Sequence, residues 1–240
     1  DADIQALAKS LHQKEPALRK EIANLREANP MLGFRGCRLS IVYPGITQMQ
    51  VKAILSAAVE CKQDGIKVFP EIMIPLVSTA QELKVILSTM EESAKEVFRL
   101  MKNSIDYQFG TMMEVPRACV QARTIAPVVR FMSFGTNDLT QMTFGFSRDD
   151  IGTFLPAYLE QKILAHDPFV TLDQQGVGHL IRTALKQSRS VNKKLQFGIC
   201  GEHGGDPNSI AFFHKTGFDY VSCSPYRIPI ARIAAAQANL

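Results

Sequence analysis

The sequence lacks the features that mark membrane proteins, secreted proteins and nucleic-acid-binding proteins. No apolar run approaches the roughly 18 residues that a membrane-spanning helix needs. The first ten residues, DADIQALAKS, are acidic and amphipathic, unlike a signal peptide. The 27 lysines and arginines are scattered, and the formal net charge is only +4. We therefore expect a soluble globular protein with neither a membrane nor a nucleic-acid partner.

Paired cysteines and familiar metal-ligand spacings are also missing. The five cysteines are an odd number, lie far apart and form no CxxC motif, and the five histidines show no HExxH spacing. This pattern argues against a disulfide framework and against a structural zinc site. It suits a protein of an intracellular, reducing compartment.

The chain also lacks a linker rich in glycine, serine or proline. With 240 residues it is one large domain or two small ones, and it is long enough for a substantial core. Helical periodicity predicts a helix over residues 1–28, and we expect residues 1–30 to form a helical segment in front of a β/α unit over 31–240. Further helices are predicted over 47–65, 79–102 and 175–190, after Pro207, and over 228–240.

Short apolar runs alternate with these helices and predict a parallel sheet. Six runs are interpreted as strands, within residues 31–44, 67–78, 107–118, 130–138, 195–205 and 218–227. Polar side chains follow five of them, just before the next helix. A doubly wound sheet would gather its site at one switch point, whereas a (β/α)8 barrel collects all strand ends at one mouth. We therefore expect an α/β fold of the (β/α)8 TIM-barrel type, with about six of the eight strands present.

The fourth predicted strand ends in the sequence SFGTNDLTQ, which places Asn137 and Asp138 at its tip. Glu114 follows the preceding strand, so neighbouring strands would present both carboxylates at one rim. Two hard oxygen ligands, with room for substrate oxygens and water, suit Mg²⁺. The alternatives are an ordinary Asn-Asp turn and a surface ion pair of Glu114 with Arg117.

Cys200 ends the strand of the sequence FGICGEHGG, beside two glycines. A thiol with a pKa near 8.5 is mostly protonated at neutral pH, so Cys200 is a candidate proton donor. The alternative is a small core residue.

Two arginines are candidates for binding an anion. Arg35 is flanked by glycines that clear space for a ligand, and Arg148 follows Asp138 by ten residues. The alternative for Arg148 is a solvated loop charge. Among the histidines, His203 alone is near the expected mouth, as a supporting residue.

Seven motifs occur in order over nearly the whole chain: NPMLGFRGCRL, EIMIPLV, GTMMEVPRA, SFGTNDLTQMTFGFSRDD, LDQQGVGHLI, CGEHGGDP and YVSCSPYRIPIARIAAAQ. Together they closely resemble the C-terminal phosphoenolpyruvate (PEP)/pyruvate-binding barrel of the pyruvate, phosphate dikinase family. PEP synthase and the first enzyme of the sugar phosphotransferase system belong to the same wider family and are the alternatives. The motifs FGFSRDD and CGEHGGDP favour the dikinase.

The resemblance implies a role for each candidate residue. It implies that Glu114 and Asp138 hold Mg²⁺, and that Cys200 exchanges the C3 proton of the pyruvate enolate. Arg35 and Arg148 match arginines that bind phosphate or carboxylate. The residues implied to contact PEP are Gly135, Thr136, Asn137 and Asp138.

The family also has parts without a counterpart among these 240 residues. They are the first two barrel strands with two substrate-binding arginines, the GGxTSHA-like segment with the phosphorylated histidine, and a nucleotide-binding domain. We therefore expect the C-terminal part of a longer dikinase that works with a phosphohistidine domain and forms a homodimer. A non-catalytic ligand-binding or dimerisation module is one alternative, and a Mg²⁺-dependent lyase or aldolase on a related barrel is another. The compartment would be the cytoplasm or an organelle such as a glycosome or plastid.

Overall fold

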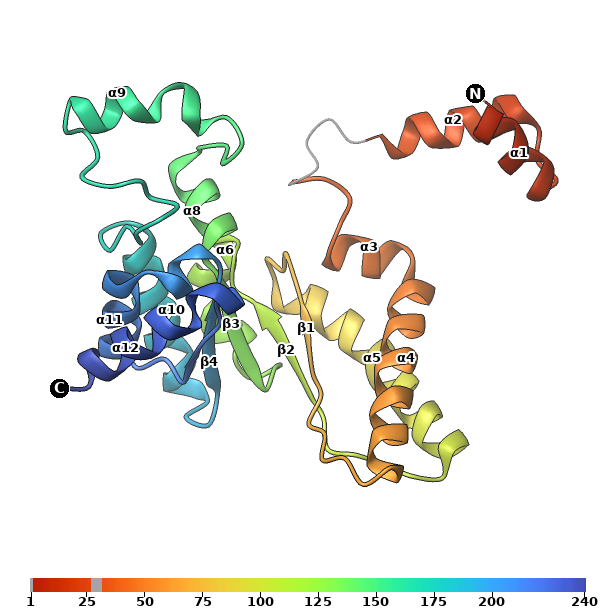
Figure 1. Cartoon of the computed structure of the whole chain (residues 1–240). Helices are drawn as coiled ribbons and strands as arrows, with labels where there is room; N and C mark the ends of the chain where they lie inside the picture. Colours follow the sequence, from red (N-terminus) through yellow and green to blue (C-terminus); the bar gives the residue numbers. More distant parts are fainter. Residues whose placement is uncertain (1, 27–31) are drawn as a thin grey trace.

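A parallel sheet forms the centre of the computed structural model, which describes residues 2–26 and 32–240 (Figure 1). Its strands are β1 (Glu71–Ile74), β2 (Gln108–Met112), β3 (Phe131–Gly135), β4 (Gln196–Cys200) and β5 (Tyr220–Val221). They lie in the sheet in chain order, and each neighbouring pair is parallel. An order without reversal contains no switch point, so the sheet fits an arc of a barrel and not a doubly wound fold. The predicted α/β class with a parallel sheet is confirmed, and closure into a barrel stays a prediction.

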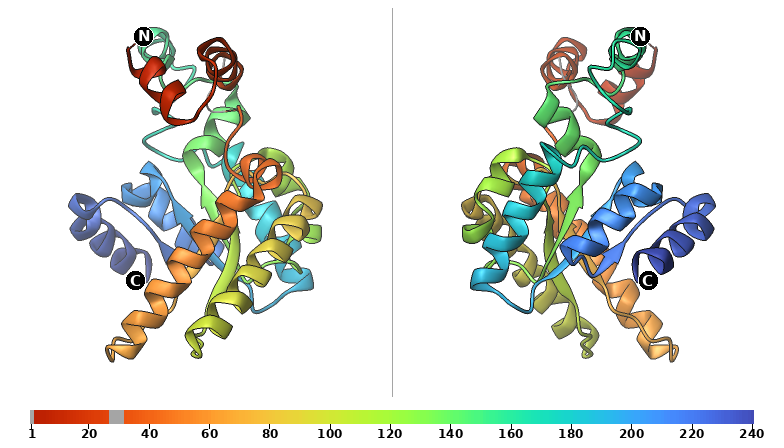
Figure 2. Two further views of the ribbon diagram at one scale, coloured as in Figure 1. Left: turned by 90° about the vertical axis from the view of Figure 1, so that its right-hand side faces the viewer. Right: turned by 90° about the vertical axis from the view of Figure 1, so that its left-hand side faces the viewer.

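Helices connect these strands and cover the sheet. The α-helices are α1 (Ala2–Ser10), α2 (Glu15–Leu25), α3 (Cys37–Val42), α4 (Pro44–Gln63), α5 (Ala80–Met101), α6 (Pro116–Val120), α7 (Ala122–Ile125), α8 (Thr136–Phe144), α9 (Leu155–Glu160), α10 (Val177–Val191), α11 (Pro207–Thr216) and α12 (Ile228–Ala238). Short 3₁₀-helices are η1 (Ile151–Thr153), η2 (Glu202–Gly205) and η3 (Pro225–Arg227). Figure 2 shows the packed pair α4 and α5 on one flank of the sheet and the pair α11 and α12 on the other. No helix of the described ranges is long and apolar enough to cross a membrane.

Local sequence signals explain where the long helices begin and end. Thr79 caps α5 by accepting the main-chain N–H of Glu82, whose carboxylate in turn accepts the N–H of Thr79 at 2.7 Å. Gly65 follows α4 with φ of +80°, a conformation that favours glycine, and the N–H of Ile66 closes the last turn on the carbonyl of Cys61. Both ends are placed as the sequence predicts.

The strand predicted within residues 31–44 is wrong for the part that the structure describes, which begins at residue 32. Residues 32–36 form a turn and α3 follows. Gly36 adopts φ of +57° against the end of β1, where a Cβ atom would lie 3.0 Å from the carbonyl oxygen of Pro75. The N–H of Cys37 then donates to the same oxygen at 3.1 Å. This segment reaches β1 at one point instead of pairing along it, so the described sheet has five strands rather than six.

The helix predicted over residues 1–28 is two helices, α1 and α2, which pack against each other and lie apart from the sheet (Figure 1). The break follows Ser10, and Pro16 sits in the first turn of α2, where its missing N–H costs nothing. The predicted boundary between residues 30 and 31 lies outside the described residues. The division into two parts stays a prediction.

The core joins the sheet to its helices and gives the strand ends a rigid base. Phe134 of β3, Phe197 of β4 and Phe213 of α11 are fully buried in one cluster. Burial of each such side chain contributes roughly 1.5–3 kcal/mol. The residues that follow β2, β3 and β4 are therefore held by packed strands.

Candidate active site

The carboxyl ends of β2, β3 and β4 bring the predicted site residues to one side of the sheet. Met112 pairs with Ser133, and Gly135 pairs with Cys200, so the three strands end nearly level. Glu114 follows β2, the segment Thr136–Asp138 follows β3, and Cys200 closes β4. We call this side of the sheet the mouth.

Glu114 is the most buried carboxylate of the mouth, with 3% of its surface exposed. The main-chain N–H of Leu76 donates to its Oε1 at 2.6 Å, and its carboxyl group is hydrogen-bonded to that of Asp138. Burial raises the pKa of Glu114 to about 7, and the charge of Asp138 acts in the same direction. The Leu76 N–H and the charge of Arg35 lower it by less. Glu114 therefore holds a proton near neutral pH when no cation is present.

This geometry excludes the two structural alternatives for the carboxylates. Arg117 donates to the carbonyl of Ser78 at 2.6 Å, and Glu114 is too buried for a surface ion pair. Asn137 and Asp138 lie in the first turn of α8 rather than in a reverse turn. An acidic residue there is favoured by the partial positive charge at a helix N-terminus.

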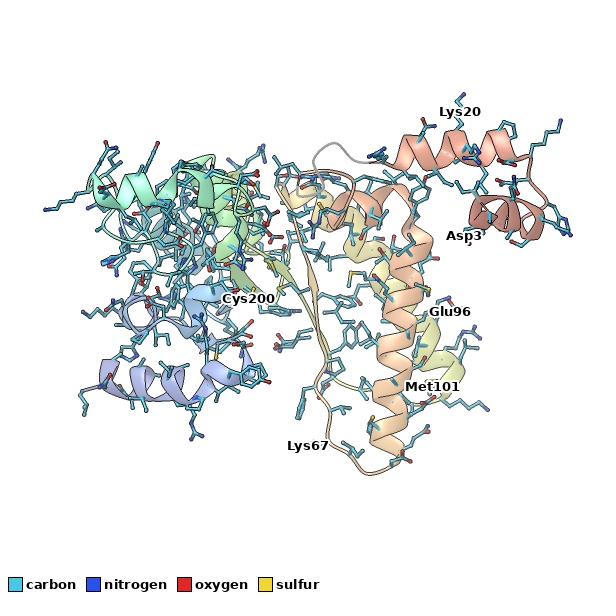
Figure 3. All side chains as sticks on the ribbon, turned by 45° about the horizontal axis from the view of Figure 1, so that its top comes forward. Asp3, Lys20, Lys67, Glu96, Met101 and Cys200 are labelled. Atoms are coloured by element: carbon cyan, nitrogen blue, oxygen red, sulfur yellow. The ribbon has the colours of Figure 1, made fainter. Side chains whose placement is uncertain are left out.

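Cys200, labelled in Figure 3, ends β4 and lies near the hydroxyl groups of Ser133 and Tyr220. Its Sγ donates to the carbonyl oxygen of Phe134 at 3.8 Å, and the hydroxyl of Ser133 lies close enough to lower the pKa of both the thiol and Tyr220. Burial raises the pKa of the thiol, and the charges of Glu114 and Asp138 raise it further. Burial also raises the pKa of Tyr220. All three groups are therefore protonated at neutral pH.

Ser133 and Tyr220 were not predicted as site residues. The ring of Tyr220 lies over Gly198, where a Cβ atom would come 1.9 Å from its Cζ. A glycine inside an apolar strand often marks such a close approach, and Ser133 is a buried polar residue in another apolar strand. These two signals would have pointed to both residues.

The two arginines reach the mouth from different elements. Arg148 pairs with Glu202 at 3.1 Å, and the N–H of Glu202 donates to the side chain of Asn137 at 3.2 Å. Arg148 is thus joined to the mouth and is not simply a solvated loop charge. Arg35, just before α3, lies near enough for its charge to lower the pKa of Glu114. The structure therefore brings all eight predicted residues together.

His203 contacts Thr136, which begins α8 at the mouth. It is fully buried, its Nε2 lies 2.8 Å from the carbonyl oxygen of Pro168, and its Nδ1 lies 2.7 Å from the hydroxyl of Thr136. A carbonyl oxygen only accepts, so Nε2 carries the hydrogen and Nδ1 of a neutral ring accepts from Thr136. Burial lowers the pKa of His203, which agrees with a neutral ring. His203 thereby ties the loop at residue 168 to the end of β3.

The donor set fits a divalent cation that is completed by substrate. The carboxyl groups of Glu114 and Asp138 adjoin, and the raised pKa of Glu114 favours a proton there that a cation can replace. Among the described residues, no cluster of three or more His, Cys, Asp or Glu side chains could hold a metal ion. A site of two carboxylates leaves the other positions to water and substrate oxygens, the arrangement that Mg²⁺ commonly takes.

Comparisons with known proteins give a consistent family. The chain is 58% identical over 224 residues to pyruvate, phosphate dikinase 2 of Zea mays, covering 93% of this chain and 25% of the relative. The chloroplastic dikinase of Flaveria pringlei is 56% identical, with 98% and 24% covered, and that of Arabidopsis thaliana (dikinase 1) is 54% identical, with 99% and 25% covered. The chain thus spans about a quarter of the length of these relatives.

A citrate lyase structure from Burkholderia xenovorans LB400 is 15% identical, covers 69% of this chain and 48% of its own, and has a TM-score of 0.46, too low to support a conclusion about the fold. The model of the family described as "PEP-utilising enzyme, PEP-binding domain" matches residues 4–240. Because this match takes in nearly the whole chain, the chain belongs to the PEP-utilising enzymes, as a PEP-binding domain.

Proposed function

We propose that this chain is the C-terminal, PEP- and pyruvate-binding part of a pyruvate, phosphate dikinase. It would transfer a phosphoryl group between PEP and a histidine on another domain, within the overall reaction ATP + phosphate + pyruvate = AMP + diphosphate + PEP. The observation that carries the proposal is the thiol of Cys200 beside the carboxyl pair of Glu114 and Asp138. A proton donor next to a cation-binding pair is what the interconversion of pyruvate and PEP needs.

The proposed half-reaction takes place at the mouth, between PEP and the histidine of the other domain. The P–O bond of PEP breaks as a P–N bond to the histidine forms, which leaves the enolate of pyruvate. The thiol of Cys200 gives its proton to the C3 carbon of the enolate, and pyruvate results. In the reverse direction the C3 proton returns to the sulfur and the enolate oxygen takes the phosphoryl group. Mg²⁺ held by Glu114 and Asp138 would supply Lewis-acid stabilisation of the negative oxygen.

The surrounding residues take roles that match their chemistry. Because its pKa is raised, Cys200 stays protonated at neutral pH, which suits an acid better than a nucleophile. The hydroxyl groups of Ser133 and Tyr220 lie near the thiol, and we assign to them the return of a proton to the sulfur. Arg35 and Arg148 offer guanidinium groups to phosphate and carboxylate.

The remaining PEP contacts are assigned to the end of β3 and the start of α8. They are Gly135, Thr136 and Asn137. The partners are a phosphohistidine domain and a second copy of the chain, and an intracellular site such as a plastid suits the chloroplastic relatives.

Calorimetric titration of the chain with PEP, with and without Mg²⁺, tests the proposal. We expect binding that needs Mg²⁺ and is weakened at least about tenfold in Asp138→Asn, because one of two cation-binding carboxylates is lost. The matched control is Asp106→Asn, which makes the same change at an exposed residue just before β2, at the opposite end of that strand. Binding that ignores both Mg²⁺ and Asp138, by a chain that circular dichroism shows to be folded, would contradict the proposal.

A further inference from the structure

Gln141 lies on α8 one turn after Asp138 and is 6% exposed. Its amide makes two hydrogen bonds in opposite directions. The Nε2–H group donates to Oδ1 of Asp138 at 3.2 Å, and Oε1 accepts the main-chain N–H of Arg148 at 2.7 Å. The orientation of the amide is fixed, because the N–H of Arg148 can only donate and must face the oxygen.

The main chain of Gln141 also makes hydrogen bonds to the segment that leads from α8 to Arg148. Its main-chain carbonyl accepts the N–H of Gly145, which ends α8 with φ of +69°, and the N–H of Phe146 at 3.1 Å. The main-chain carbonyl of Gln141 therefore accepts the last hydrogen bonds of α8. Its side chain holds the following segment next to the helix through the N–H of Arg148. Gln141 thus links the main chain of Arg148 directly to the carboxylate of Asp138.

The far end of Arg148 is held by a second connection that returns to α8. Its guanidinium pairs with Glu202, and the N–H of Glu202 donates to Asn137, the neighbour of Asp138. Asp138, Gln141, Arg148, Glu202 and Asn137 thus form a closed ring. Gln141 is the member whose side chain touches both the carboxylate of Asp138 and the segment of Arg148.

We propose that Gln141 is a positioning residue that fixes the distance between the cation-binding carboxylate of Asp138 and the anion-binding guanidinium of Arg148. This inference rests on the proposed function. It adds that the fixed spacing of these two groups would let the mouth bind a phosphorylated acid and Mg²⁺ at the same time. An apolar residue of similar size would leave the N–H of Arg148 without its acceptor and Asp138 without this donor.

The test compares Gln141→Met with Thr140→Val in the whole chain. Methionine keeps the length of glutamine but neither donates nor accepts strongly at these positions. Thr140 is the adjacent residue of α8, fully buried, with a hydroxyl that has no hydrogen-bond partner among the described residues. Thr140→Val is therefore a near-isosteric control on the same helix.

Two readouts separate the inference from the proposed function. Without any ligand, hydrogen exchange followed by NMR should show the Arg148 amide exchanging about tenfold faster or more in Gln141→Met and unchanged in Thr140→Val. With PEP and Mg²⁺, calorimetry should show affinity reduced about tenfold in Gln141→Met alone. Failure of the unaltered chain to bind PEP with Mg²⁺ would count against the proposed function, while the exchange measurement still decides whether Gln141 positions Arg148.

The inference is overturned if Arg148 exchange is unaffected, if Gln141→Met binds like the unaltered chain, or if Thr140→Val loses as much affinity. A double-substitution cycle adds a third criterion. In an Arg148→Ala background the loss caused by Gln141→Met should fall to about threefold or less, because part of it acts through the guanidinium. An undiminished tenfold loss would mean that Gln141 acts on Asp138 alone.

Discussion

The carboxyl groups of Glu114 and Asp138 are hydrogen-bonded to each other at the mouth of the sheet. Because Glu114 is buried beside a second carboxyl group, its protonated form is favoured over a second negative charge. Burial, reinforced by the charge of Asp138, raises the pKa of Glu114 to about 7. A proton would therefore compete with the proposed Mg²⁺ for the same oxygens.

The first prediction concerns the pH dependence of cation binding. Because the cation must displace one proton, the affinity of the chain for Mg²⁺ should rise up to about tenfold per pH unit below pH 7 and level off above it. Titration calorimetry with MgCl₂ between pH 5.5 and 8.5 measures this slope. An affinity that is flat with pH, or that falls as pH rises, would contradict a site built on Glu114.

The second prediction is that Glu114→Gln stabilises the ligand-free chain at high pH. The pKa of Glu114 is raised in the fold, so its favourable contribution is complete below its unfolded value near 4.5 and is lost as pH rises through about 7. Glutamine keeps an oxygen for the N–H of Leu76 and never ionises. The free energy of unfolding, measured with urea, should favour Glu114→Gln by up to about 3 kcal/mol at pH 8 and by little at pH 4. Equal differences at both pH values would show that ionisation of Glu114 costs nothing.

Sequence reasoning predicts the fold where local signals and packing agree. Thr79 followed by Glu82 forms a capping box, and Gly65 ends a helix, because both depend on residues a few positions apart. The segment around Gly36 is predicted as a strand because its apolar residues and glycines are typical of one. The contact with the carbonyl of Pro75, 39 residues away, turns it into a helix start. That contact is tertiary and leaves no periodic signal.

The location of the candidate site could also be predicted only in part. Residues at the tips of strands, such as Glu114, Asp138 and Cys200, are predicted to lie together because parallel strands end on one side, and the structure places them there. Ser133 and Tyr220 lie within strands, and their contact with Cys200 depends on the register of three neighbouring strands. Register is set by packing across the sheet, which a single sequence does not reveal.

The third prediction concerns His203, whose pKa is lowered by burial. As pH falls below 6.5, His203 takes up a proton in the unfolded chain before it does so in the folded one. The contribution of the neutral ring to the free energy of unfolding is therefore complete above pH 6.5 and is lost as pH falls through the lower pKa of the folded state. Urea unfolding should show a decrease of up to about 1.4 kcal/mol per pH unit below pH 6.5. In His203→Gln this part of the slope should vanish, whereas His166→Gln, at an exposed histidine, should keep it. An unaltered slope in His203→Gln would assign the acid sensitivity to other groups.

The fourth prediction separates proton transfer from binding. In D₂O with Mg²⁺, the chain should exchange the methyl protons of pyruvate, and Cys200→Ala should abolish the exchange. Tyr220→Phe keeps the ring over Gly198 but removes the hydroxyl, so it should slow exchange about tenfold and leave PEP affinity unchanged. Proton NMR follows the exchange and calorimetry the affinity. A Tyr220→Phe variant that exchanges at the original rate would remove Tyr220 from the proton path.

The last prediction uses a glycine whose backbone is unstrained, so that only a clash is introduced. Gly135 has φ of −83°, and a Cβ atom there would lie 2.8 Å from Oε2 of Glu114 and 2.7 Å from Sδ of Met112. The methionine end can move, but the Glu114 carboxylate is held by the N–H of Leu76 and must be displaced from Asp138. Gly135→Ala should therefore cost about 1–3 kcal/mol of unfolding free energy and weaken Mg²⁺ binding at least about tenfold.

Gly152→Ala is the matched control for this substitution, because a Cβ atom at Gly152 meets nothing within 4 Å. Urea unfolding and MgCl₂ titration on both variants separate a general loss of stability from a local loss of the cation. If Gly135→Ala is destabilised yet binds Mg²⁺ as the unaltered chain does, the position of Glu114 cannot matter for the cation. If it binds poorly while remaining folded at the temperature of the titration, the close packing of Gly135 against Glu114 is what holds that carboxylate in place for the metal.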